Sequence, residues 1–196
     1  NNSIADKISS EMGDKDFMEA STFHMEFIKN LKLDKSVIPI LFDIAKYQLN
    51  YKGDLTNQYH VSRKVSPGDS KECYRAHFDS HLFTIVFPLK IPTSRQKDPC
   101  GELIIFPNVR SNPKYEIQNV ISKLWYKKYA SKTKLEELSK NKQMVLINFH
   151  DYCPIIFRGN TFLHTNKELS ESANHHRLTC LSHFFDPFAS FGIGSF

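Results

Sequence analysis

From Leu55 onward the chain consists of short segments of β-type composition, and this feature limits its fold more than any other. β-branched and aromatic residues dominate each segment, and turn residues such as Pro, Gly, Asn and Asp separate most of them. The segments are 55–65, 74–90, 102–106, 144–149, 155–157, 161–165 and 177–185. Several short strands with regular breaks are typical of a β-sandwich or barrel, so the sequence predicts a mainly β fold.

Helical spacing occurs in two regions, the first fifty residues, which contain two series, and the segment 112–142. The first helical series comprises Phe17, Ala20, His24, Phe27, Ile28 and Leu31, and the second comprises Leu41, Ile44, Ala45 and Gln48. A helical insertion is predicted over 112–142, where Ile117, Val120, Ile121, Leu124 and Lys128 form a stripe. With 40% apolar side chains, we expect 1–196 to form one domain, in which helices within 1–53 flank a β core of 55–187.

The excess positive charge comes from one segment. Eight lysines and three glutamates lie between Lys114 and Lys142. The resulting charge of +5 equals the net charge of the whole chain. Such a charge run is usually a solvated helix face, but a basic helix can also bind nucleic acid, anionic lipid or an acidic metabolite. The same insertion is a candidate surface for forming a homo-oligomer.

The sequence contains no run of about 18 apolar residues, and no basic stretch followed by an apolar core opens it. These observations favour a cytoplasmic protein with no membrane span. The cysteines at 73, 100, 153 and 180 are far apart and form no C-x-x-C pair. We therefore expect neither a structural zinc site nor a disulfide framework, and we interpret the cysteines as small buried residues.

Two H-x-[D/E] triplets occur, His77-Phe78-Asp79 and His24-Met25-Glu26. With nine histidines and 21 acidic residues in 196 positions, about one such triplet is expected by chance, so the pattern alone is no evidence. Residues two apart project from the same face of a strand, whereas on a helix they diverge by about 200°. His77 and Asp79 lie in a segment of strand character and can chelate one ion, while His24 and Glu26 lie in a predicted helix and cannot.

A third ligand must come from elsewhere, and His164 is the best candidate because it lies in an apparent strand, 85 residues after Asp79. Two imidazoles and one carboxylate form the facial triad typical of non-heme iron(II), which leaves coordination positions open. His81, four residues after His77 on the same predicted strand face, is an alternative first ligand. Arg177, with a planar fork for a carboxylate, and Thr179, two residues further on the same face, could anchor an acidic ligand.

The order H-x-D, distal His and R-x-T resembles the iron(II)- and 2-oxoglutarate-dependent dioxygenases, over roughly 59–187. This resemblance implies a double-stranded β-helix, a cupin-like jelly roll with the N-terminal helices packed on one sheet. It implies that His77, Asp79 and His164 bind Fe(II), and that dioxygen and 2-oxoglutarate are co-substrates. It also implies that Arg177 and Thr179 hold the far carboxylate of 2-oxoglutarate. Because related halogenases replace the carboxylate ligand with a small residue, Asp79 favours hydroxylation over halogenation.

The sequence predicts a hydroxylase acting on a small polar metabolite such as a sugar, an amino acid or another carboxylate. A protein or peptide hydroxylase of the same superfamily and a non-catalytic jelly-roll binding module are the alternatives. A nucleic-acid demethylase of this superfamily is expected to carry a second arginine six residues after the first, where this chain has His183, which weighs against a nucleic-acid substrate. Tyr59, Arg63 and Tyr74 could face the cavity or pack as structural residues, and His183 could line it too.

Overall fold

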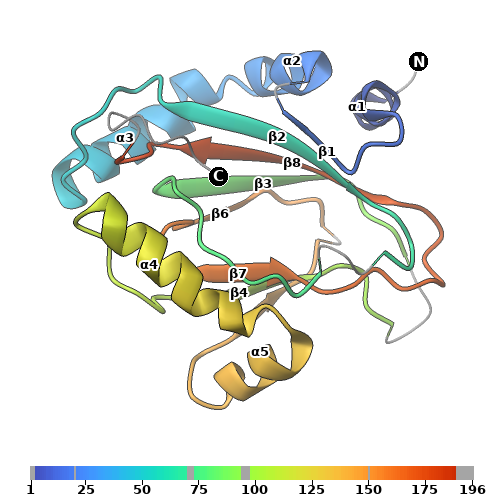
Figure 1. Cartoon of the computed structure of the whole chain (residues 1–196). Coiled ribbons are helices and arrows are strands. Elements are labelled where there is room, and N and C mark those ends of the chain that lie inside the picture. Colours follow the sequence, from blue (N-terminus) through green and yellow to red (C-terminus); the bar gives the residue numbers. More distant parts are fainter. Residues whose placement is uncertain (1–2, 20, 70–72, 94–97, 150, 189–196) are drawn as a thin grey trace.

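The computed structural model describes residues 3–19, 21–69, 73–93, 98–149 and 151–188. Two antiparallel sheets lie face to face in this part of the chain, and helices cover the outer face of the larger one (Figure 1). The larger sheet has the order β1 (Phe17–Glu19), β2 (Gln58–Val65), β8 (Arg177–Phe184), β3 (Phe83–Lys90) and β6 (Ile155–Phe157). The smaller sheet has the order β5 (Val145–Ile147), β4 (Leu103–Phe106) and β7 (Leu163–Asn166). The predicted mainly β architecture with flanking helices is confirmed.

Three helices pack on the larger sheet: α1 (Ile4–Met12), α2 (Thr22–Asn30) and α3 (Val37–Gln48), with the short 3-10 helix η1 (Leu33–Lys35) between the last two. Side-chain caps fix where the first two begin, because Ser3 accepts from the amide of Asp6 and Ser21 accepts from that of His24. Their apolar faces join one side of β3 and β8 in a single buried cluster. The helices therefore hold the larger sheet from outside and leave its inner face for the site.

Strand alternation sorts the side chains of β8 between these two faces. Leu178, Cys180 and Phe184 belong to the cluster under the helices, whereas Arg177, Thr179, Leu181 and His183 line a cavity between the sheets. The antiparallel register with β2 places Arg63 opposite Thr179 and Tyr59 opposite His183. Two adjacent strands thus direct a row of polar side chains toward the smaller sheet.

Two predicted elements differ from the structure. Phe17 does not begin a helix; it lies in β1, an edge strand whose pairing of Phe17 with Arg63 outweighs local helical spacing. The segment 74–82 is not a strand, because Tyr74 has a positive φ of 57° and only His77 makes a bridge there. Ala20, assigned to the first helical series, falls outside the described residues.

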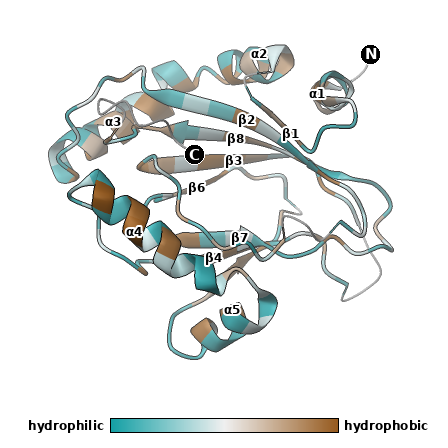
Figure 2. Ribbon diagram, viewed as in Figure 1, coloured by the Kyte–Doolittle hydropathy of each residue, from teal (hydrophilic) through white to brown (hydrophobic). Residues whose placement is uncertain are grey.

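The predicted helical insertion is present as α4 (Glu116–Tyr126), the 3-10 helix η2 (Lys127–Tyr129) and α5 (Lys132–Ser139). The apolar stripe of α4 is exposed, and its residues give the brown bands on this helix in Figure 2. Its exposed members are Ile117, Val120, Ile121 and Leu124, joined by Trp125. The buried residue of this helix is instead polar, Asn119. Assembly of copies through this insertion stays a prediction.

Within the described residues, no helix combines the length and apolar character needed to cross a membrane. All four cysteines are free thiols, as expected. Cys180 is buried, Cys73 and Cys100 are half-buried, and Cys153 is exposed, so the interpretation as buried residues holds for Cys180 and is wrong for Cys153.

Candidate metal centre

His77 and His164 are direct neighbours across an antiparallel bridge. The amide of His77 donates to the carbonyl of His164 at 3.0 Å, and the amide of His164 donates back at 3.1 Å. The two imidazole rings project to the same side, with their centroids 4.4 Å apart. One ligand candidate is therefore on β7, and the other is on an irregular segment that pairs with β7 at a single position.

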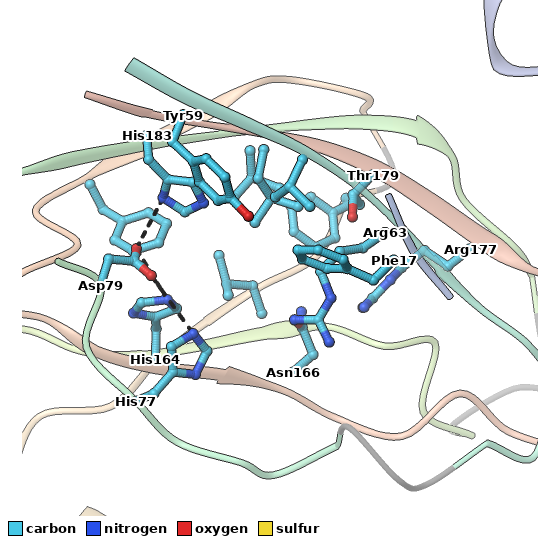
Figure 3. A pocket seen from close by; sticks show the side chains of 16 residues that line it. Phe17, Tyr59, Arg63, His77, Asp79, His164, Asn166, Arg177, Thr179 and His183 are labelled. Carbon is cyan, nitrogen blue, oxygen red and sulfur yellow. Dashed lines mark ion pairs between the residues drawn. The ribbon is translucent and has the colours of Figure 1, made fainter. Parts of the chain in front are cut away.

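Asp79 completes the group from the same irregular segment, two residues after His77. Its amide donates to the carbonyl of Gly159 at 3.0 Å. Its carboxylate lies 3.7 Å from Nε2 of His77 through Oδ1, and 3.5 Å from Nε2 of His164 through Oδ2 (Figure 3). The ligand atoms of these three residues all lie within 4.8 Å of one another.

The alternative first ligand, His81, is not part of this group. Its ring stacks on Tyr59 with centroids 6.1 Å apart and lies beside His183, with centroids 5.6 Å apart. The structure therefore brings together His77, Asp79 and His164, and it places His81 in a neighbouring aromatic cluster.

The donor set fits a first-row transition metal. With metal–ligand bonds of about 2.1 Å, neighbouring ligand atoms of an octahedral site lie about 3 Å apart, so small side-chain shifts suffice. Both imidazoles are oriented by backbone carbonyls, since Nδ1 of His77 lies 2.9 Å from the oxygen of Arg75 and Nδ1 of His164 lies 3.0 Å from that of Phe162. A carbonyl can only accept, so each Nδ1 carries a proton, which leaves each Nε2 as the atom that would bind a metal.

The environment keeps Asp79 ionised. Burial alone would raise the pKa of Asp79, but the imidazoles of His164 and His183 and their hydrogen bonds outweigh it and hold that pKa well below its ordinary value. The hydroxyl of Thr84 donates to Oδ2 of Asp79, and it also lies 3.0 Å from Nδ1 of His183. A carboxylate ligand and its supporting groups are thus in place.

Gly159 permits this close packing. A Cβ at this position would lie 2.5 Å from both Oδ2 of Asp79 and Oγ1 of Thr84, closer than side-chain atoms pack. The absence of a side chain at 159 lets the turn after β6 approach the carboxylate and accept the Asp79 amide.

Arg177 and Thr179 lie at the other end of the same cavity (Figure 3). Arg177 is 4% exposed, and its Nη1 donates to the carbonyl of Gly101. Gly101 has a φ of +76°, and a Cβ there would meet that Nη1 at 2.5 Å. The buried Nε of Arg177 has no hydrogen-bond partner among the described residues. Burial, followed by the nearby Arg63, lowers the pKa of Arg177 to about 10, so the guanidinium stays charged at neutral pH.

A cavity of about 140 Å³ joins the two ends. Tyr59 and Arg63, predicted as possible cavity residues, line it, and so does His183. Tyr74 does not line it and packs instead in the apolar cluster outside the smaller sheet. Two guanidinium groups, Arg63 and Arg177, therefore share this small cavity with one carboxylate of the protein, which suits an anionic ligand.

Two residues that line the cavity were not predicted from the sequence. Asn166 lies two positions after His164 on β7, so strand alternation would have placed it in the cavity. Phe17 also lines the cavity, but no local signal indicates this, because its position depends on the pairing of β1 with a strand far along the chain.

The fold and site together define a two-sheet β protein with a two-histidine, one-carboxylate group between its sheets. No model of a protein family matches the chain, and no curated protein matches it. Similar solved structures include a Pseudomonas putida prolyl-4-hydroxylase, at 12% identity and a TM-score of 0.46, over 86% of this chain and 66% of the other. A non-heme α-ketoglutarate-dependent carbocyclase from nogalamycin biosynthesis has 8% identity and a TM-score of 0.46, over 91% and 72%.

A Cellulomonas parahominis L-ribose isomerase is also similar, at 10% identity and a TM-score of 0.35, and the matched part is 65% of this chain and 50% of the isomerase. The similar structures thus include a hydroxylase and a carbocyclase as well as an isomerase. At these identities the likeness concerns the fold, and the functional proposal below depends on the site itself.

Proposed function

We propose that this protein is an iron(II)- and 2-oxoglutarate-dependent oxygenase with a double-stranded β-helix core, and that it hydroxylates a small polar molecule. The observation that carries the proposal is the cavity itself. It has a two-histidine, one-carboxylate group at one end and, at the other, a buried arginine whose Nε has no hydrogen-bond partner in the described part of the chain. This is the arrangement that a short dicarboxylate bound to a metal requires.

Each residue has a distinct role in the proposed reaction. His77, Asp79 and His164 would hold Fe(II), which when bound supplies the activation of dioxygen. Arg177 and Thr179 would bind the far carboxylate of 2-oxoglutarate. Apolar side chains of the cavity, Val86, Leu103, Phe149, Phe157 and Leu181, would exclude water from the reacting groups.

The overall reaction balances. One oxygen atom of dioxygen enters a substrate C–H bond as a hydroxyl, and the other enters 2-oxoglutarate, which loses carbon dioxide and becomes succinate. The protein donates no electrons, because oxidation of 2-oxoglutarate and of the substrate together supplies the four that dioxygen accepts.

Metal binding and turnover can be tested without knowing the substrate. The purified protein should bind one Fe(II), and with ascorbate and 2-oxoglutarate it should release succinate slowly in uncoupled turnover. His164→Ala should lose both properties, whereas His175→Ala, whose side chain lies outside the cavity, should retain both. A protein that binds no metal and forms no succinate with broad pools of candidate substrates would refute the proposal.

A further inference from the structure

A second, larger hollow adjoins the candidate metal centre. It has a volume of about 610 Å³ and shares Phe17, Arg63, His77 and Asn166 with the smaller cavity. The side chain of His77 is 49% exposed, in contrast to 7% for His164. His77 therefore separates the two spaces, and the larger hollow, called here the basic groove, reaches the metal group on the side of this histidine.

The lining of the basic groove is strongly cationic. Its positive side chains are Arg63, Lys64, Arg75, Lys123 and Lys127, and its acidic ones are Asp16 and Asp69. Five cations against two carboxylates leave an excess of three positive charges around a concave surface. Such a surface attracts anions, because charges of one sign lining a hollow reinforce each other.

The cations come from separate parts of the chain. Arg75 lies two residues before His77 in the irregular segment, and its carbonyl orients that ring. Lys123 and Lys127 come from α4 and its C-terminal end, and Lys123 donates to Ser80 at 2.8 Å. Lys64 donates to the carbonyl of Gly13. These hydrogen bonds of Lys64 and Lys123 are to neutral oxygens, so the bonds themselves neutralise neither charge.

The dimensions of the basic groove indicate the size of its ligand. Small-molecule sites usually measure about 300–1,000 Å³, whereas the inner cavity of about 140 Å³ leaves little room beyond a co-substrate. A substrate therefore needs an adjoining space from which to approach the metal group, and the basic groove provides one, because His77 lines it.

We propose that the substrate of this enzyme is a small anion whose carboxylate or phosphate group binds in the basic groove, with Arg75 and Lys127 as its main contacts. Both residues are exposed and line the groove, Arg75 from the irregular segment and Lys127 from the C-terminal end of α4. This inference rests on the proposed oxygenase function and narrows its substrate class. It also gives part of the lysine-rich insertion a role, because Lys123 and Lys127 belong to that segment.

Anion binding can be measured apart from turnover. Citrate and inorganic pyrophosphate, titrated by calorimetry into metal-free protein, should both bind, and their affinity should fall as salt rises. Arg75→Glu and Lys127→Glu should each weaken binding about five- to tenfold, whereas Lys142→Glu makes the same charge change at an exposed site outside the groove and should have little effect. Circular dichroism would verify that each variant is folded.

Arg177→Gln distinguishes the groove from the inner cavity. If the probes bind in the groove, this variant should retain their affinity. Loss of affinity in Arg177→Gln together with unchanged affinity in the two groove variants would place the anions in the inner cavity and overturn the inference. Absence of binding by both probes would overturn it too.

Substrate preference supplies the second arm. A carboxylic acid and the amide with the same carbon skeleton should differ as substrates. The acid should raise succinate release further above the uncoupled rate than the amide does. Uncoupled release without any such preference would refute the inference and leave the proposed function standing. Binding of the probes by a protein that binds no metal and forms no succinate would refute the proposed function and leave anion binding in the groove standing.

Discussion

Arg177 offers the sharpest quantitative test of the site. Its Nη1 already donates to the carbonyl of Gly101, which leaves Nη2 and Nε to bind a carboxylate, and Nε has no partner among the residues that the structure describes. Arg177→Gln removes the charge and at least one of these donors. A hydrogen bond to a charged group contributes about 1.5–3 kcal/mol, so we expect a loss of about 2–4 kcal/mol in 2-oxoglutarate binding.

This loss corresponds to an increase of about 30- to 1,000-fold in the KM for 2-oxoglutarate, measured as succinate release at saturating Fe(II). Arg177→Lys keeps the charge without the planar fork, so its KM for 2-oxoglutarate should lie between those of Arg177→Gln and the original protein. Thr179→Val, which removes one hydroxyl at constant shape, should raise the KM about tenfold. A KM within threefold of the original protein in Arg177→Gln would refute the assignment of this end of the cavity.

Stability must be followed in the same variants. Arg177→Gln removes the charged donor to the buried carbonyl of Gly101, which keeps the hydrogen bond from Asn166 Nδ2 at 3.3 Å, so the loss should cost about 0.5–1.5 kcal/mol and lower the Tm by roughly 1–6 °C. Fe(II) content should not change, because Arg177 lies at the opposite end of the cavity from the metal ligands. A parallel loss of metal and of 2-oxoglutarate affinity would indicate general unfolding rather than loss of a specific contact.

Three further predictions concern the supporting residues. Thr84→Val removes the hydroxyl that donates to Asp79 and should weaken Fe(II) binding about 10- to 100-fold, as measured by competition with a chelator. Gly159→Ala forces a Cβ against the Asp79 carboxylate and should reduce metal content and the Tm together. Burial lowers the pKa of His24 and of His60 to about 4. Between about pH 6.5 and 4 these histidines bind protons in the unfolded chain only, so the free energy of unfolding should fall as the pH drops through this range. Urea titrations of His24→Met should show a weaker pH dependence.

Each of these predictions has a distinct contradicting result. Gly13→Ala is a control for Gly159→Ala, because a Cβ at Gly13 meets no atom of the described residues within 4 Å, and its positive φ of 55° makes the substitution strain the backbone instead. It should lower the Tm without altering metal content. Unchanged metal affinity in Thr84→Val would show that Asp79 needs no support from the hydroxyl. Equal pH dependence of unfolding in His24→Met and the original protein would show that the pKa of His24 is the same in the folded and the unfolded chain.

Much of the site was predictable because strand alternation is a local property. Arg177, Thr179 and His183 share one face of β8 as their spacing requires, and the alternation of β7 likewise turns His164 inward. The strands themselves were recognisable from β-branched and aromatic composition. Composition does not show which strands pair when they lie far apart in the sequence. The edge strand β1, which pairs with β2, was therefore interpreted as the start of a helix.

The orientation of α4 was unpredictable for a different reason. A periodic apolar stripe normally faces the core, yet here the polar face is the buried one. Arg110 explains this reversal, because its Nη2 donates to the side chain of Asn119 at 2.8 Å and its Nη1 donates to Ser122. Its Nε donates to the carbonyl of Asn160 at 2.7 Å. One half-buried cation from outside the helix decides which face packs inward, and no pattern within the helix reveals it.

The same arginine helps to explain how an irregular segment can hold two ligand candidates in place. His77 is fixed by its bridge and Asp79 by the carbonyl of Gly159, while Phe78 between them points the opposite way and is 2% exposed. The guanidinium of Arg110 lies 4.0 Å from the centre of the Phe78 ring, and the ring of Tyr126 meets it edge-on at 5.1 Å. The segment therefore keeps the alternation of a strand without belonging to a sheet, because the insertion packs against its central side chain. That alternation, and not a continuous strand, is what the H-x-D spacing requires.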